Sequence, residues 1–226
     1  SLLTLGIGNY SEFEGKFTSA NYSPDGKSIV LGDDAGNVLI WDYINEHIYY
    51  PRSQDKHQNF VLSVEFSPDG SKIVSSSADS SIVLWKLDGS LKKINTLDIS
   101  KYQPGVWVRS VRFLPSGSEL LTALSDGTIL LWDIHSLQII QRLSGHHGEV
   151  ESLSVSSDGG FAVSGARDGE VRFWDLQVFK SRANIGISPT FQSNLEINSM
   201  IFTNDGKYLI GGAANGYVYI LDTNTK

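Results

Sequence analysis

The chain has 226 residues, 40% of them hydrophobic and 19% charged, and its formal net charge is -7. This composition is typical of a globular protein, and the negative charge disfavours binding to nucleic acid or to an anionic membrane. The absence of cysteine excludes disulfides and thiolate metal sites, and no apolar run is long enough to span a bilayer. The start at Ser1 has neither methionine nor a basic leader, so we expect no signal peptide and a domain of a longer chain.

Short predicted strands, separated by tight turns, follow one another along the whole chain. Residues 2–8 form an isolated apolar run that precedes the first complete unit. In the clearest unit, residues 61–66 alternate in polarity, a Ser-Pro-Asp-Gly turn follows at 67–70, and two further β-branched runs lie at 72–76 and 82–85. A fourth, more polar run follows in four of the units, at 47–50, 92–96, 138–142 and 182–186. No segment has a helical period, so the predicted class is all-β.

The unit is repeated five times with a fixed internal spacing. Each copy has a turn glycine and, fifteen residues later, a large apolar residue: Gly26 with Trp41, Gly70 with Trp85, Gly117 with Trp132, Gly159 with Trp174, and Gly206 with Leu221. Successive copies begin 42 to 47 residues apart, which is the length of a four-stranded propeller blade. The sequence therefore predicts a single domain, a β-propeller of five four-stranded antiparallel blades.

The predicted blades lie near 13–54, 57–99, 104–143, 145–188 and 193–226. The last blade ends after its third predicted strand. We expect the N-terminal run at 1–8 to supply the fourth strand and to close the ring, because closure removes open sheet edges. The alternative is that the five blades are an excerpt of a larger propeller.

These units resemble the repeats of the WD-repeat (WD40) family. The resemblance extends over residues 13–222 and rests on Ser-Pro-Asp-Gly at 23–26 and 67–70, on Gly145-His146, and on the Trp-Asp pairs at 41–42, 132–133 and 174–175. Propellers of that family usually have seven blades, so a ring of five is uncommon among them. The resemblance implies a module that binds other proteins.

The resemblance also implies a structural tetrad in each blade. In the family, an aspartate in the turn between the second and third strands accepts a hydrogen bond from a histidine, which reaches a serine that contacts the tryptophan indole. Two blades carry the full set: His57, Ser75, Asp79 and Trp85 in the second, and His146, Ser164, Asp168 and Trp174 in the fourth. Because these aspartates satisfy buried donors, we expect them to be structural and not catalytic.

The other three blades depart from the tetrad. The third keeps Thr122, Asp126 and Trp132, and the first keeps only Trp41. The substituted positions are Phe13, Leu31 and Ala35 in the first blade, Pro104 in the third, and Asn215 and Leu221 in the fifth. We expect apolar packing to hold these blades and their turns to be softer.

The sequence contains no recognisable catalytic or cofactor-binding constellation. It has no glycine-rich phosphate loop, and the neighbouring His146 and His147 point to opposite faces of a strand, so they do not form a metal pair. We therefore expect no enzyme activity, no cofactor and no metal. Two alternatives stay open: a five-bladed sugar-binding or glycosidase-type propeller with paired carboxylates in its channel, and a sensor domain of a larger signalling protein.

By position, the resemblance implies a partner-binding surface on the top face of the propeller. In each blade that face is built by the residues that flank the first apolar residue of the first strand, and by the residue before the tetrad aspartate. The predicted partner-binding set is Phe60, Leu62, Trp107, Arg109, Glu149, Glu151, Arg167 and Glu196. Exposed aromatics beside an arginine are typical of interaction hot spots, and the three glutamates suit a basic residue on a partner.

The alternative for Phe60 and Trp107 is that they pack between the second and third blades, because large aromatic side chains are usually buried. The preferred interpretation is a protein-interaction scaffold with a protein or peptide partner, and with neither nucleic acid nor membrane. We expect it inside the cell, as a subunit of a complex or a domain of a longer chain.

Overall fold

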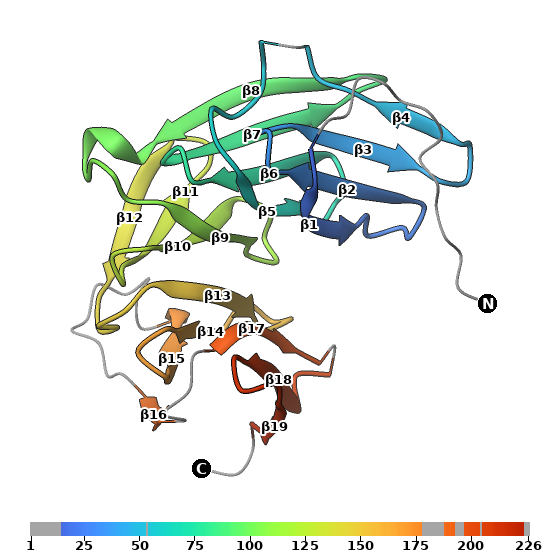
Figure 1. The fold of residues 1–226 in the computed structure, drawn as a ribbon. Helices are drawn as coiled ribbons and strands as arrows, with labels where there is room; N and C mark the ends of the chain where they lie inside the picture. Colours follow the sequence, from blue (N-terminus) through green and yellow to red (C-terminus); the bar gives the residue numbers. More distant parts are fainter. Residues whose placement is uncertain (1–14, 53, 178–187, 193–196, 204, 224–226) are drawn as a thin grey trace.

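The computed structural model describes residues 15–52, 54–177, 188–192, 197–203 and 205–223. Within them, nineteen strands form five antiparallel sheets that follow one another along the chain (Figure 1). Each sheet is built from consecutive strands, and neighbouring strands in the sequence are neighbours in the sheet. Among the described residues, no helix is both long and apolar enough to cross a membrane.

The first sheet contains β1 (Phe17–Tyr22), β2 (Ser28–Asp33), β3 (Val38–Asp42) and β4 (His47–Tyr49). The second contains β5 (Val61–Phe66), β6 (Lys72–Ser77), β7 (Ser81–Leu87) and β8 (Leu91–Asp98). The third contains β9 (Val108–Phe113), β10 (Glu119–Leu124), β11 (Ile129–Asp133) and β12 (Gln138–Leu143). The fourth contains β13 (Val150–Val155), β14 (Phe161–Ala166), β15 (Glu170–Asp175) and β16 (Ser188–Gln192), and the fifth contains β17 (Ile197–Phe202), β18 (Tyr208–Ala213) and β19 (Val218–Asp222).

These sheets confirm the predicted all-β class and the five-bladed β-propeller. The strand that pairs with β15 is β16, which begins at Ser188. The fourth strand predicted at 182–186 lies outside the described residues. Residues 188–192 include Thr190 and Phe191, which have high β-propensity. A 3-10 turn at Ile99–Lys101, capped by the side chain of Asp98, was not predicted.

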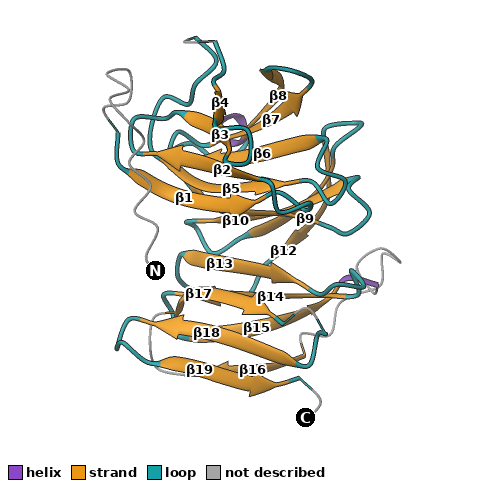
Figure 2. Cartoon of the chain, turned by 90° about the vertical axis from the view of Figure 1, so that its right-hand side faces the viewer, coloured by secondary structure: helices purple, strands orange, loops and turns teal. Residues whose placement is uncertain are grey.

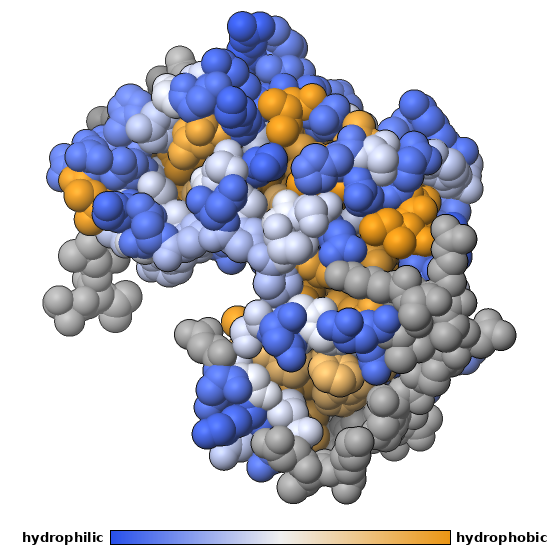
Figure 3. Space-filling model, turned by 180° about the vertical axis from the view of Figure 1, so that it is seen from behind, coloured by the Kyte–Doolittle hydropathy of each residue, from blue (hydrophilic) through white to orange (hydrophobic). Residues whose placement is uncertain are grey.

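The sheets are arranged as an arc in which each first strand lies beside the first strand of the next sheet. In Figure 2, β13 to β19 form the lower part of the molecule and β1 to β12 the upper part. The first and fifth sheets lie at the two ends of the arc in Figure 1, and Figure 3 shows a deep hollow between the lower part and the rest. The predicted closing strand at 1–8 lies outside the described residues.

Four apolar clusters hold the sheets together, one at each contact between neighbours. Trp85 of the second sheet packs on the first sheet, Trp132 of the third packs on the second, and Trp174 of the fourth packs on the third. All three indoles are almost fully buried. The regular spacing of tryptophan in the sequence therefore reflects one repeated interface, in which the tryptophan-bearing face of a sheet covers the preceding sheet.

Two glycines in second strands illustrate how tightly these interfaces are packed. A Cβ on Gly165 would lie 2.5 Å from Cγ2 of Ile197, whereas a Cβ on Gly211 would lie 3.6 Å from Cγ of Met200, an ordinary contact distance. Gly211 also lines a small apolar pocket between the fourth and fifth sheets, together with Val171 and Tyr219. Gly165 therefore has no room for a methyl group, whereas Gly211 has room for one.

We therefore expect opposite effects from the same substitution at these two positions. Gly211→Ala should raise the free energy of unfolding by about 0.5 kcal/mol, because alanine reduces the entropy of the unfolded chain and fills open space. Gly165→Ala should lower it by about 1–3 kcal/mol through overpacking. Chemical denaturation of both variants measures the difference, and equal shifts in the same direction would contradict the observed packing.

Candidate partner-binding rim

A β-bulge lies one residue into the first strand of every sheet. The pairing shifts between Phe17 and Ser19, between Val61 and Ser63, and at the corresponding places in the other sheets. The residues left without a paired partner are Thr18, Leu62, Arg109, Glu151 and Asn198. Bulges re-aim side chains and are common beside functional sites, so these residues leave the regular alternation of the strand.

In four of the five blades, the same backbone hydrogen bond lies beside the bulge. The N–H of Asp34 donates to the carbonyl of Lys16, Ala78 to Phe60, and Ser125 to Trp107, each at 3.0 Å, and Arg167 donates to Glu149 at 2.9 Å. The residues predicted for the top face therefore occupy equivalent positions in these blades. We call the surface formed by Phe60, Leu62, Trp107, Arg109, Glu149, Glu151 and Arg167 the rim. Glu196, predicted for the same surface, lies outside the described residues.

The two aromatic residues of the rim are accessible to solvent. Phe60 is 50% exposed and Trp107 is 42% exposed, so neither ring is buried between the second and third blades. The guanidinium carbon of Arg109 lies 5.3 Å from the centroid of the Trp107 ring, a favourable cation–π distance. The backbone N–H of Trp107 also donates to Oγ of Ser125 at 2.9 Å, which fixes the start of the strand.

The charged residues of the rim are paired with one another across the third and fourth blades. Arg109 donates through Nε to Glu149 at 3.0 Å and through Nη2 to Glu151 at 2.8 Å, and Arg167 donates through Nε to Glu151 at 2.5 Å. The network contains two arginines and two glutamates, so its net charge is zero. Residues of this chain therefore already neutralise Glu149 and Glu151, and their contact with a basic residue of a partner stays a prediction.

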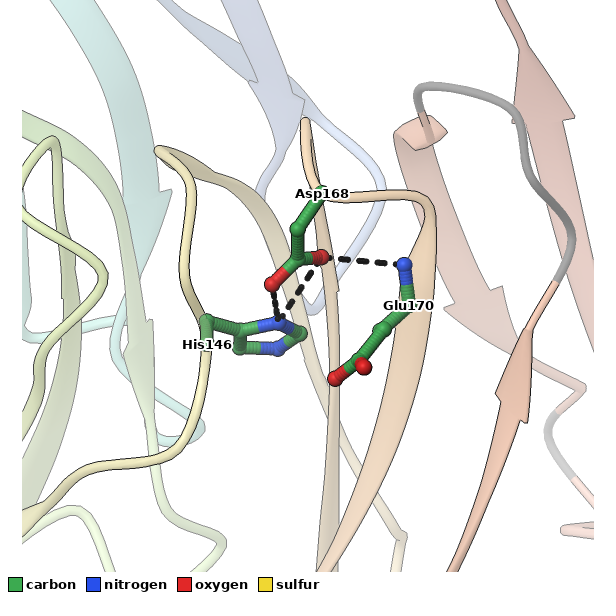
Figure 4. A group of neighbouring side chains, drawn as sticks. All are labelled: His146, Asp168 and Glu170. Carbon is green, nitrogen blue, oxygen red and sulfur yellow. Dashed lines mark hydrogen bonds and ion pairs between the residues drawn. The ribbon is translucent and has the colours of Figure 1, made fainter.

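The fourth blade contains the complete chain of hydrogen bonds that the sequence predicted. Trp174 donates to Oγ of Ser164 at 2.8 Å, and Oγ of Ser164 lies 2.7 Å from Nε2 of His146. Nδ1 of His146 lies 3.0 Å from Oδ2 of Asp168, and Figure 4 shows the two side chains facing each other. Burial lowers the pKa of His146 despite the nearby Asp168 carboxylate, so the ring is neutral and Nδ1–H donates to the aspartate.

Asp168 stays ionised in this arrangement. Partial burial disfavours its charge, but the backbone N–H groups of Glu170 and His147, together with His146, outweigh burial and hold the pKa of Asp168 below its usual value. The carboxylate therefore anchors the turn between β14 and β15 to the loop that precedes β13.

The second blade has the same arrangement with one additional contact. Nε2 of His57 lies 2.7 Å from Oγ of Ser75, which accepts from Trp85 at 2.8 Å. Nδ1 of His57 lies 3.2 Å from Asp79 and 2.9 Å from Oγ of Ser81. Although burial opposes it, hydrogen bonding from His57 and Ser81 holds the pKa of Asp79 well below its usual value.

Two further residues replace missing members of the tetrad, and the sequence analysis did not identify them. In the third blade, Nε2 of Gln103 donates to Asp126, so the residue before Pro104 takes the place of histidine. In the first blade, the fully buried Asp33 accepts from the backbone N–H groups of Ala35 and Asn37 at 3.0 and 2.7 Å. Two features of the sequence could have identified them. Gln103 is an amide directly before Pro104, the expected histidine position, and Asp33 lies two residues before Ala35, the expected aspartate position.

One group of side chains in the described residues has the composition of a metal site. Donor atoms of His146, Asp168 and Glu170 lie within 4.8 Å of one another (Figure 4). Both imidazole nitrogens are hydrogen-bonded within the tetrad, and Nε of Arg172 donates to Glu170 at 2.8 Å. A guanidinium on the third carboxylate disfavours a cation there, so the group acts as a hydrogen-bonded cluster.

The first strands of the sheets, which we call the inner strands, include one carboxylate, Glu65, with an altered pKa. Glu65 of β5 is 19% exposed, and it lies 3.9 Å from Nε of Arg112 and accepts from the backbone N–H of Phe113 at 2.5 Å. Burial raises the pKa of Glu65 to about 7, although Arg112 and Phe113 favour the charged form.

The free energy of unfolding should therefore depend on pH through Glu65. The folded protein holds this proton up to about pH 7, whereas the unfolded chain releases it near pH 4.5. Stability should fall as the pH rises between these values, and the loss should persist above them. Compared with Glu65→Gln, the wild type should lose about 3 kcal/mol between acidic and mildly alkaline solution. Denaturation at several pH values measures this, and parallel pH profiles of the two proteins would contradict it.

Sequence comparison identifies the repeat. The profile of the family described as WD domain, G-beta repeat matches residues 50–86, 91–133 and 137–175, more than half of the chain. The chain belongs to the WD-repeat family. The matched segments cover most of the second, third and fourth sheets and include both complete tetrads.

Known relatives match over short stretches. Small ribosomal subunit protein RACK1z of Arabidopsis thaliana is 58% identical over 36 residues, which is 16% of this chain and 11% of that protein. Pre-mRNA-processing factor 19 of Oryza sativa subsp. japonica is 36% identical over 87 residues, 38% of this chain and 16% of that protein. Periodic tryptophan protein 2 homolog of Schizosaccharomyces pombe is 35% identical over 79 residues, 35% of this chain and 9% of that protein. The matches thus span less than a fifth of each of these WD-repeat relatives.

Proposed function

We propose that this WD-repeat chain is a non-catalytic scaffold that binds a peptide or protein partner on the rim. The observation that supports this most directly is the exposure of Phe60 and Trp107, at 50% and 42%, at equivalent positions of neighbouring blades. Half-exposed aromatic rings on a backbone fixed by hydrogen bonds lose little entropy on binding and bury a large apolar area.

The chemistry of the rim favours an apolar anchor on the partner. Because Arg109 and Arg167 already neutralise Glu149 and Glu151, a charged ligand residue would gain little there unless it displaced one of them. An apolar or aromatic side chain placed against Phe60 and Trp107 is the ligand group that this surface accepts most favourably.

The names of two relatives are consistent with a role inside an assembly. One is a protein of the small ribosomal subunit and another is a pre-mRNA-processing factor. We therefore propose that this chain also works as part of an intracellular complex, with neither nucleic acid nor membrane as its direct ligand.

The sugar-hydrolysing alternative has less support. It requires two carboxylates in the channel. The carboxylates on the described first strands of the five sheets are Glu65 and Glu151. Glu65 accepts from the backbone N–H of Phe113 in the next blade, and Glu151 accepts from Arg109 and Arg167, so both are engaged in contacts within the chain.

A photo-crosslinking experiment tests the proposed surface. A benzophenone amino acid at position 107 should form crosslinks to the partner in host lysate, whereas the same group at position 140 should not. Ile140 is a matched control because it is 43% exposed in the same blade but lies on the outer strand β12. Equal crosslinking from both positions to the same proteins would overturn the proposed location.

A further inference from the structure

The fifth sheet has an apolar face that is exposed, although the same face is buried in the other sheets. Val218 is 68% exposed and Ile220 is 66% exposed. The residues equivalent to Val218 are Val38, Ile82, Ile129 and Val171, and all of them are at most 2% exposed. The fifth sheet therefore has an interface of the usual composition without the usual cover.

Strand pairing shows that these residues form a continuous surface. Ile201 pairs with Ile210, which pairs with Ile220, and Gly212 beside them pairs with Val218. Paired residues share one face of a sheet. We call the face formed by Ile201, Ile210, Val218 and Ile220 the open face. None of the strand-paired residues just named is charged.

The other four interfaces show what covers such a face. Ile82 and Leu84 of the second sheet lie in one cluster with Trp132 of the third, and Ile129 and Leu131 of the third lie in one cluster with Trp174 of the fourth. The cover is in each case the following sheet, through the face that carries tryptophan or, in the fifth sheet, Leu221.

Hydrogen bonds between neighbouring inner strands follow the same repeat. The backbone N–H of Val64 donates to Oγ of Ser19 at 3.1 Å, and the N–H of Met200 donates to Oγ of Ser152 at 2.7 Å. Ser199 of the fifth sheet occupies the position equivalent to these serines. The open face thus has both the apolar residues and the hydroxyl acceptor of a blade interface.

The first sheet carries a tryptophan-bearing face that is not part of any of the four clusters. Trp41 belongs to none of them; it pairs across the sheet with Ile29, which pairs with the 65% exposed Tyr22. We call the face formed by Tyr22, Ile29 and Trp41 the Trp41 face. The open face and the Trp41 face are complementary in type, but they lie at opposite ends of the arc (Figure 1). The hollow in Figure 3 lies between the lower part, which includes the fifth sheet, and the rest.

We propose that the open face of one copy packs against the Trp41 face of a second copy of this chain. The contact repeats the interface that already joins neighbouring sheets within the chain, and a second copy provides the one tryptophan-bearing face that these clusters leave unused. Because the two surfaces are different, the association is head-to-tail and allows dimers and longer oligomers.

Sedimentation velocity over a range of concentrations tests the proposal, with the folded state of each variant checked by thermal melting. The wild type should associate in a concentration-dependent manner. Ile220→Asp should weaken association about a hundredfold or more, because a carboxylate would be buried without a partner. Tyr22→Asp should weaken it from the other side. Ile94→Asp, on the outer strand β8 and 41% exposed, is the matched control and should associate like the wild type.

Mixing the two variants distinguishes head-to-tail packing from other modes. Ile220→Asp retains an intact Trp41 face and Tyr22→Asp retains an intact open face, so an equimolar mixture should form dimers but no longer oligomers. A monomeric wild type would overturn the proposal. If Ile220→Asp then also melted at a lower temperature, the open face would be covered within the chain. Association that persists in both variants, or a mixture that stays monomeric, would equally overturn head-to-tail packing.

Discussion

Asp168→Ala is expected to lower the free energy of unfolding by about 2 kcal/mol, because this carboxylate satisfies three donors at once. It accepts from the backbone N–H groups of His147 at 2.7 Å and Glu170 at 2.9 Å, and from Nδ1 of His146 at 3.0 Å. His146 is only 7% exposed, so water does not easily replace the lost acceptor. Chemical denaturation measures the effect, and circular dichroism confirms that the variant is folded.

The same substitution in the third blade is the control. Asp126 occupies the equivalent turn but is exposed and accepts from the side chain of Gln103 and the backbone N–H of Thr128. Water can replace these contacts, so Asp126→Ala should change stability by about 0.5 kcal/mol. Equal losses at the two positions, or wild-type stability of Asp168→Ala, would show that the buried histidine does not set the strength of the tetrad.

The fold was predictable because its determinants are local and repeated. Turns such as Ser67 to Gly70 close in the same way each time: Ser67 donates to Asp69 at 2.5 Å and accepts from the N–H of Lys72, and Gly70 has a φ of 71° that favours glycine. The fixed distance from this turn to tryptophan places the indoles of Trp85, Trp132 and Trp174 on the preceding sheet. Such a pattern is visible in a single sequence because each repeat is an independent copy of it.

The details of the candidate site were less predictable because they depend on contacts between blades. Glu149 and Glu151 are about forty residues from Arg109 in sequence, and nothing in the repeat indicates that they pair with it. Gln103 and Asp33 were missed for a related reason: each takes over a tetrad role from a position shifted by one or two residues. A motif search by fixed spacing does not detect a side chain that reaches the same place from a neighbouring position.

The position of Leu62 on the rim also depends on a backbone irregularity. Strict alternation would place Leu62 on one face of its strand and Ser63 on the other, but the bulge between Val61 and Ser63 removes Leu62 from the pairing. The sequence pattern of an apolar residue, a variable residue and a serine recurs in all five first strands. The variable residue in this pattern is the one that the bulge frees, a position that the resemblance to the family singles out and that strand periodicity alone does not.

Phe60→Ala combined with Trp107→Ala is expected to abolish capture of the partner without unfolding the protein. Truncation of an aromatic hot spot weakens binding by about 2 kcal/mol or more, about thirtyfold for each residue. Both rings are about half exposed, so their removal should lower stability only slightly. Arg109 is left unchanged, because its side chain is only 13% exposed and its removal would take away one of the two arginines that pair with Glu149 and Glu151. Affinity capture from host lysate with quantitative mass spectrometry measures the result.

The matched control is Ile94→Ala combined with Ile140→Ala, which removes two comparably exposed apolar side chains from the outer strands of the same two blades. This control should capture the same proteins as the wild type. If the aromatic double variant also does so while remaining folded, the rim does not hold the partner. If the double variant melts several degrees lower, the rings contribute to packing more than their exposure indicates. Only the combination of lost capture and unchanged melting assigns Phe60 and Trp107 to a partner rather than to the propeller itself.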